Sequence, residues 1–278
     1  MNHNELYKML ALPGEVIEKL NSYEKDRTFQ MPAELQNRLL TCTAWDDAVK
    51  ELQGLLEGDT HGFQMLYEML HIVCEYSYPK YKELKVSDEI FAETMKFVTR
   101  FLNWHMEYYG EYKYTQALWF PREMAVVEFR IGALEYEFID GETREIAVHI
   151  PSDAVFNRES ILESLKAFVK FRNTYFPEWQ GVNFVCDTWM LAPAMEELLG
   201  ETSNVLAFKH MFELDVISED ATWFMGFIFP GHENDDLEKL PENSSLHKKA
   251  KAYLLSGKKI GVAKGHLTDE IMQLIGAD

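Results

Sequence analysis

The spacing of apolar residues changes near residue 130 of this chain, and that change limits the folds it can adopt. Before it, apolar side chains recur every three or four positions, as in Phe63–Tyr76, a pattern typical of amphipathic helices. After it, Ala133–Ile139 alternates apolar with acidic residues, and Asp140-Gly141 is a strong tight-turn signal before a second alternating run at Glu145–Ile150. We therefore expect a helical first part and a second part that contains a sheet.

The order of elements in the second part predicts the fold class. After the hairpin, a helix from about Arg158 to Tyr175 and a strand at Val182–Leu191 form a strand–helix–strand crossover. The elements expected downstream are a short helix at Pro193–Leu199, strands at Asn204–Leu214 and Thr222–Phe229, a helix at Ser244–Leu255 and a short strand among Gly257, Gly261 and Gly265. The prediction is an α+β protein: an all-helical N-terminal domain over residues 1–115, then a mixed α/β domain over residues 116–278 that begins with a helix from Gln116 to about Glu128.

Composition narrows the class of partner. The formal net charge is −19, which opposes binding to nucleic acid or to an anionic membrane surface, because both need Lys and Arg to neutralise phosphates. No apolar run approaches the roughly 18 residues of a membrane span. The first residues, Met1–Glu5, have neither a basic start nor an apolar signal segment. We therefore expect a cytoplasmic protein that binds neither nucleic acid nor a membrane.

Cysteine and histidine spacing gives little support for a disulfide framework or a metal site. Cys42, Cys74 and Cys186 lie far apart in sequence, which favours buried free thiols. His71 and Glu75 are four residues apart on one predicted helix, but two ligands in a densely apolar segment favour packing. The sequence predicts no metal.

The ends of the two crossover strands carry the best candidates for chemistry. Ligands of open α/β sheets lie beyond the carboxyl ends of the strands. His149 ends the first strand, and Asp187 and Trp189 lie near the end of the second, on one face because side chains alternate. A histidine beside a carboxylate can act as a general base. The alternative is that His149 bonds the backbone and Asp187 caps a turn, while alternation directs Cys186 to the opposite, buried face.

Two further features concern ligands. Asn204 could orient a ligand amide or simply close the turn after Thr202. No glycine-rich phosphate motif occurs, so the best phosphate candidate is the start of the crossover helix, where backbone amides can bind an anion. In the loop Ser152–Asn157 before it, Asp153 would repel an anion and Arg158 would attract one.

Several spaced segments resemble a known family. They are Arg130–Glu137, Ile146–Ser152, Tyr175–Pro177, Cys186–Leu191 and Ser203–Phe208. Together they are similar to bacterial acyltransferase-domain proteins that have a helical N-terminal domain and a GNAT-like C-terminal domain. The resemblance spans nearly the whole chain. It implies transfer of an acyl group from acyl-coenzyme A (acyl-CoA) to a small-molecule amine or acyl acceptor.

The resemblance also implies roles for individual residues. His149 and Asp187 would be catalytic, at the point where the crossover strands separate to admit the pantetheine arm. Ile150, Ser152, Asn157 and Arg158 would bind the coenzyme, and Trp189, Asn204 and Glu137 would bind the acceptor. The chain departs from the family pattern in the pyrophosphate loop, where Ser152–Asn157 has no glycine. A GNAT-like module without catalysis, which binds a ligand or a partner protein, therefore stays open as the alternative.

Overall fold

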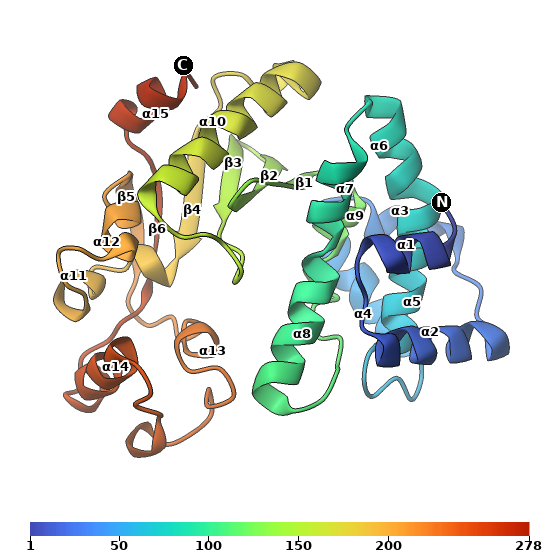
Figure 1. Ribbon diagram of the computed structural model, residues 1–278, viewed down its shortest axis with the longest axis horizontal. Helices are drawn as coiled ribbons and strands as arrows, with labels where there is room; N and C mark the ends of the chain where they lie inside the picture. The colour runs from blue at the N-terminus through green and yellow to red at the C-terminus, as the bar shows by residue number, and fades with distance from the viewer. Residues whose placement is uncertain (278) are drawn as a thin grey trace. The chain divides into compact units, whose positions relative to one another are not determined.

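The computed structural model describes residues 1–277 and divides into two compact units, Met1–Ile131 and Gly132–Asp278. The first is helical apart from one strand, and the second is built on a sheet (Figure 1). This confirms the predicted α+β class. The boundary predicted between residues 115 and 116 stays a prediction. Within residues 1–277, none of the helices has the length and apolar character that a membrane span requires.

The first unit is a set of short helices around an apolar interior. Its elements are α1 (His3–Met9), α2 (Gly14–Asp26), α3 (Ala33–Leu39), α4 (Trp45–Leu55), α5 (Phe63–Ile72), a π-helical turn (Val73–Ser77), α6 (Tyr78–Leu84), α7 (Asp88–Met95), α8 (Phe97–Tyr109), α9 (Pro121–Met124) and β1 (Glu128–Ile131). Gly110 adopts a left-handed conformation, φ 77°, and ends α8 as its sequence position predicts.

One expectation for this region is wrong. The helix predicted from Gln116 to Glu128 is only the single turn α9, and the chain is extended again from Glu128. Pro121 occupies the first turn of α9, where its missing N–H costs nothing. Val126 then takes a positive φ of 62°, which a β-branched residue adopts rarely and which cannot continue a helix. The spacing of apolar residues alone does not reveal this break.

The second unit is a mixed sheet with helices. Its elements are β2 (Leu134–Asp140), β3 (Arg144–His149), α10 (Arg158–Tyr175), β4 (Phe184–Thr188), α11 (Met195–Leu198), α12 (Asn204–Lys209), β5 (Phe212–Ser218), α13 (Met225–Ile228), α14 (Ser245–Leu255), β6 (Val262–Leu267) and α15 (Asp269–Ile275), with short 3-10 turns at Pro177–Trp179, Trp189–Leu191 and Leu237–Lys239. The strands lie in the order β2-β3-β4-β6-β5. The β3–β4 pair is parallel and its neighbours are antiparallel.

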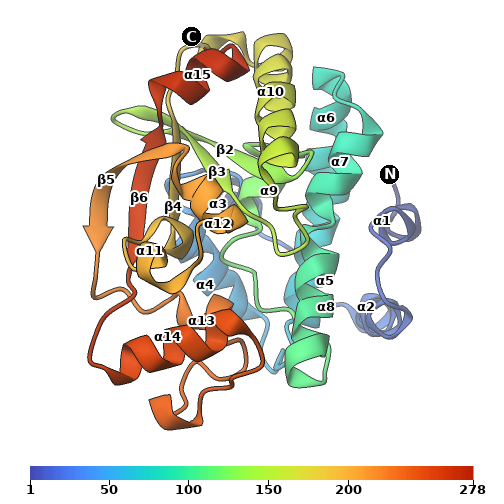
Figure 2. The same ribbon diagram turned by 60° about the vertical axis from the view of Figure 1, so that its left-hand side comes forward.

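Helix α10 lies along one face of this sheet (Figure 2), and aromatic side chains make the contact. Phe168 stacks on Tyr136 of β2 with ring centroids 4.0 Å apart, and it meets the edge of Phe184 of β4 at 5.8 Å. All three side chains are fully buried. The Ser164 hydroxyl ties the helix to β2 through the Leu134 N–H and the Tyr136 hydroxyl, at 3.2 and 2.9 Å. Because side chains alternate, the remaining residues of β2 and β3 project from the opposite face.

Two predicted strands are helical instead. The segment predicted as a strand from Asn204 to Leu214 contains α12, and β5 begins only at Phe212. The Ser203 side chain accepts a hydrogen bond from the Val205 N–H and so caps α12. The segment Thr222–Phe229 contains the helical turn α13, although its aromatic residues favour a strand locally.

The cysteine prediction holds for two of three residues. Cys74 and Cys186 are buried free thiols, whereas Cys42 is exposed. Burial raises the pKa of the Cys74 thiol to about 11. Cys186 is 1% exposed, as alternation with Asp187 predicts. A thiol held protonated in this way is a poor nucleophile.

Candidate active site

The candidate site is where strands β3 and β4 separate. Their parallel pairing consists of Ile146 with Phe184 and Ala147 with Val185. Beyond Val185, strand β4 continues to pair with β6, where Thr188 is the Cα partner of Ala263. The β3–β4 pairing thus stops before the end of β3, and a chain with alternating N–H and C=O groups can pair at such a separation of strands.

His149 ends β3 and contacts a carboxylate of the same unit. Its Nε2 lies 3.1 Å from Oε2 of Glu137 on β2. The His149 side chain is 24% exposed and that of Glu137 is 10% exposed, so the pair is shielded from water while the imidazole stays accessible. A carboxylate in this position can orient the imidazole ring.

The partner of His149 corrects one expectation. The sequence suggests Asp187 as the orienting carboxylate, but Asp187 is exposed and Glu137 makes the contact. The hairpin explains this result. In the β2–β3 register Glu137 is the Cα partner of Ala147, so it lies diagonally across from His149 on the same face. The Asp140-Gly141 turn and strict alternation could have indicated this neighbour from the sequence.

The remaining residues at the end of β4 have separate environments. By alternation from Ala147 and Val185, His149 and Asp187 project from one face of the sheet. Trp189, predicted to line the acceptor pocket, is 8% exposed in a 3-10 turn and packs in a hydrophobic cluster with Phe224. The same face carries an ion pair of Lys264 with Glu145, whose Nζ–Oε distances are 2.9 and 2.7 Å.

The loop after β3 leads into the predicted phosphate site. The Asn157 side chain accepts a hydrogen bond from the Ser160 N–H at 3.0 Å and caps α10. The cap fixes the first turn of an 18-residue helix, whose remaining amides and positive dipole end can receive an anion. Arg158 begins that turn, while Ile150 and Ser152 lie in the preceding loop. Asn204 does not join this group by any hydrogen bond between described residues, because it is an exposed residue at the start of α12.

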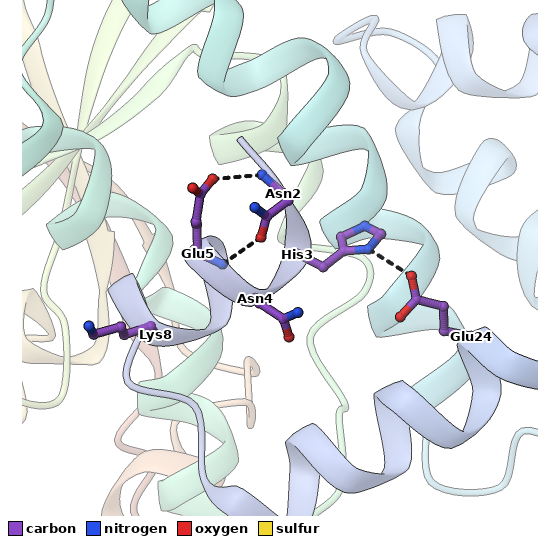
Figure 3. A pocket seen from close by; sticks show the side chains of 6 residues that line it. All are labelled: Asn2, His3, Asn4, Glu5, Lys8 and Glu24. Atoms are coloured by element: carbon purple, nitrogen blue, oxygen red, sulfur yellow. Dashed lines mark hydrogen bonds and ion pairs between the residues drawn. The ribbon is translucent and has the colours of Figure 1, made fainter.

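A pocket lies in the first unit, whereas the predicted catalytic residues belong to the second. It is lined by Asn2, His3, Asn4, Glu5, Lys8 and Glu24 of α1 and α2 (Figure 3). Asn2 and Glu5 are joined by reciprocal hydrogen bonds that cap α1, each at 3.0 Å. Its polar groups are thus engaged in local structure, and the chemistry points instead to His149.

Two family profiles match nearly the entire chain. Residues 1–126 match an N-acyltransferase N-terminal domain, and residues 128–267 match a GNAT-like C-terminal domain. The chain belongs to this family of two-part GNAT-like proteins. The predicted resemblance is therefore confirmed. No curated protein matches the sequence.

Solved structures of the same fold are acyltransferases. One, an acyltransferase in complex with decanoyl-CoA and teicoplanin, has a TM-score of 0.75 and 21% identity over 95% of this chain and 86% of that chain. A mutant acyltransferase in complex with octanoyl-CoA has a TM-score of 0.75 and 20% identity over 95% and 87%. An acyltransferase in complex with CoA and 10C-teicoplanin gives the same values. At these identities the likeness shows the fold of this GNAT-like chain.

Proposed function

We propose that this protein transfers an acyl group from acyl-CoA to an amine, with His149 as the general base. The main support for this proposal is the contact between His149 and Glu137 where β3 and β4 separate. Family membership supports the proposal, as do the acyl-CoA and CoA ligands named for the solved structures. The glycopeptide in two of those complexes supports a small-molecule acceptor. We place the reaction in the cytoplasm.

The reaction needs a neutral amine next to a thioester. His149 accepts a proton from the incoming ammonium, and the carboxylate of Glu137 stabilises the imidazolium that results. The amine nitrogen then attacks the thioester carbonyl carbon, and the tetrahedral intermediate collapses with cleavage of the C–S bond. The amine loses its second proton as the thiolate leaves and is protonated. The products are an amide, the free thiol of CoA and one proton.

The residues at the separation fit an acyl-CoA substrate. The end of β3, beyond its pairing with β4, suits the amides of a pantetheine arm, and the capped start of α10 with Arg158 suits a phosphate. Ile150 and Ser152 would line the path between these two points. Asp187 would face the acceptor, because it projects from the same face as His149.

The loop before α10 favours a second candidate. Residues 152–157 contain no glycine and include Asp153, which opposes an anion. This observation favours a GNAT-like module that binds a ligand or partner protein without catalysis. It differs from the first proposal in one measurable respect, which is binding of CoA.

Release of free thiol from acyl-CoA separates the two candidates. Purified protein is mixed with acetyl-CoA or decanoyl-CoA and a panel of primary amines, and thiol is measured with a chromogenic disulfide. We expect amine-dependent thiol release and an increase in Tm with CoA. His149→Ala should lower turnover roughly 10²- to 10⁴-fold and keep the CoA-induced increase. An unchanged Tm at millimolar CoA, together with no thiol release, would sink the transferase proposal.

A further inference from the structure

Exposed apolar side chains of the second unit gather at one edge of the sheet. Strand β5 is antiparallel to β6, and β6 is antiparallel to β4, so β5 ends at the same edge as β3 and β4. Large exposed apolar residues follow these strand ends: Val155 after β3, Val216 and Ile217 at the end of β5, and Trp223 and Phe227 around α13. This is the edge at which His149 lies.

The turn α13 presents two opposite faces. Phe224 and Ile228 are 3% exposed and pack in one hydrophobic cluster with Trp189, which directly follows β4. This packing fixes α13 beside the carboxyl end of β4. Trp223 and Phe227, one position earlier on each side, are 45% and 63% exposed and meet edge to face with centroids 5.7 Å apart. In both ribbon views α13 lies beyond the ends of β4 and β5 (Figures 1 and 2).

The surrounding segment is acidic. Residues 212–242 contain one lysine and nine acidic residues: Glu213, Asp215, Glu219, Asp220, Glu233, Asp235, Asp236, Glu238 and Glu242. Asp236, Glu242 and Asp220 pair with lysines, and Asp235, Asp215 and Glu213 face histidines, so their charge is partly compensated. The Asp187 side chain at the end of β4 adds a further exposed carboxylate. Exposed aromatic rings in a negative field favour a ligand that is both apolar and cationic, because the ring faces attract cations and the ring surfaces bury apolar groups.

We propose that Trp223 and Phe227, here called the aromatic pair, bind the apolar body of a cationic amine acceptor. The inference rests on the proposed transfer reaction and names its acceptor class: primary amines with an aromatic or bulky apolar group. The acidic segment favours this occupant over the acyl-CoA substrate, whose phosphates it would repel. The aromatic pair would hold the body of the amine while its nitrogen extends toward His149.

Binding without turnover tests the inference directly. The probe is 2-phenylethylamine, and its affinity for the full chain is measured by calorimetry without acyl-CoA. We expect Trp223→Ala and Phe227→Ala each to weaken binding roughly three- to tenfold. Leu255→Ala, a matched control at an exposed site on α14, should bind as the wild type does. Ethanolamine, which lacks the apolar body, should bind weakly to all four proteins.

Charge is tested with a neutral analogue. We expect 2-phenylethanol to bind more weakly than 2-phenylethylamine, and we expect added salt to reduce the affinity of the amine alone. Equal affinities of wild type and Trp223→Ala for 2-phenylethylamine would overturn the inference. So would a higher KM for decanoyl-CoA, but not for the amine, in Trp223→Ala, because the pair would then hold the acyl chain.

Other occupants of the aromatic pair also give distinct results. Binding to phosphatidylcholine vesicles that is lost in Trp223→Ala would assign the pair to a lipid surface and overturn the inference. Self-association lost in the same variant would assign it to a second copy of the chain, with the same consequence. Failure of the transfer reaction appears separately, as absence of thiol release with every acyl-CoA. Normal thiol release with unselective amine use contradicts the inference alone.

Discussion

The two faces of strand β2 differ in chemistry although both are buried. Tyr136 and Phe138 project toward α10 and pack on aromatic rings. Glu135 and Glu137, which alternate with them, are also buried. Burying apolar groups stabilises a fold, whereas buried carboxylates need polar partners, such as His149 for Glu137. One strand thus supplies an apolar face that packs against α10 and a polar face that carries part of the candidate site.

The largest expected effect is on the α10 face. Phe168→Ala removes the ring that stacks on Tyr136 and meets Phe184, so it should lower the free energy of unfolding by about 3–5 kcal/mol. Denaturant unfolding measures this change. Phe227→Ala is the matched control, because the same truncation at a ring that is 63% exposed should change stability by less than about 0.5 kcal/mol. Equal losses in both variants would contradict the assignment of this face to the core.

Substitutions on the opposite face of β2 should lower the rate of acyl transfer more than they lower stability. Glu137→Gln keeps the size of the side chain but removes the charge beside His149, so we expect kcat to fall roughly ten- to a hundredfold. The fall in Tm should be small. Glu145→Gln is the control: it removes a carboxylate from the same face, where it pairs with Lys264. If both variants lost the same activity, the negative charge of the face as a whole, and not the contact with His149, would be responsible.

The periodicity of the sequence predicted the apolar and polar faces of β2 and β3, but it did not predict every helix and strand of the second unit. The Asp140-Gly141 turn and the alternation in β2 and β3 fixed the hairpin, and the spacing of apolar residues predicted α10 with its bounds Arg158–Tyr175. The aromatic run around α13 failed as a predictor, because Phe224 and Ile228 are buried by tertiary packing that local propensity does not contain.

The candidate site could likewise be predicted only in part, because some of its contacts depend on tertiary structure. Position at a strand end selects His149 from the sequence. Its neighbour depends on cross-strand register, which selects Glu137 and leaves Asp187 exposed. The family resemblance predicted the class of reaction, whereas the composition predicted only that the protein carries a large negative charge.

One charged residue interrupts the apolar face, and its removal should have a moderate effect. Arg172 of α10 is 1% exposed, lies over the ring of Phe184 at 5.9 Å, and bonds the Asn173 side chain through Nε. Within residues 1–277 its Nη1 has no hydrogen-bond partner. Burial lowers the pKa of this guanidinium. Arg172→Met keeps the stem and removes a poorly compensated charge, so unfolding free energy should rise by about 1 kcal/mol.

Thermal and denaturant unfolding of Arg172→Met test this expectation against Lys170→Met, an exposed position on the same helix. Lys170→Met should be nearly neutral. A loss of stability of about 3 kcal/mol or more in Arg172→Met would mean that the guanidinium is well paired, and the α10 face would then be less apolar than its aromatic contacts indicate.

The smallest expected effect is on the pH dependence of stability, and it concerns a second histidine, His71, whose surroundings differ from those of His149. In the first unit, Nδ1 of His71 lies 3.3 Å from Nε2 of His3, so one imidazole faces another instead of a carboxylate. Burial lowers the pKa of His71, and the charges of His3 and Arg27 add to this, while Glu75 and Glu68 oppose it. The unfolded chain therefore takes up a proton that the folded chain resists, and stability present above about pH 6.5 is lost as the pH falls below it.

His71→Gln removes this proton uptake and keeps a polar side chain. We expect the decrease in Tm between about pH 7.5 and about pH 5.5 to be smaller in this variant than in the wild type. His61→Gln is the control, because it makes the same substitution at an exposed histidine of the same unit. An unchanged pH dependence in His71→Gln would mean that the imidazole pair tolerates a proton, for which Glu24, 3.4 Å from Nδ1 of His3, is the nearby carboxylate.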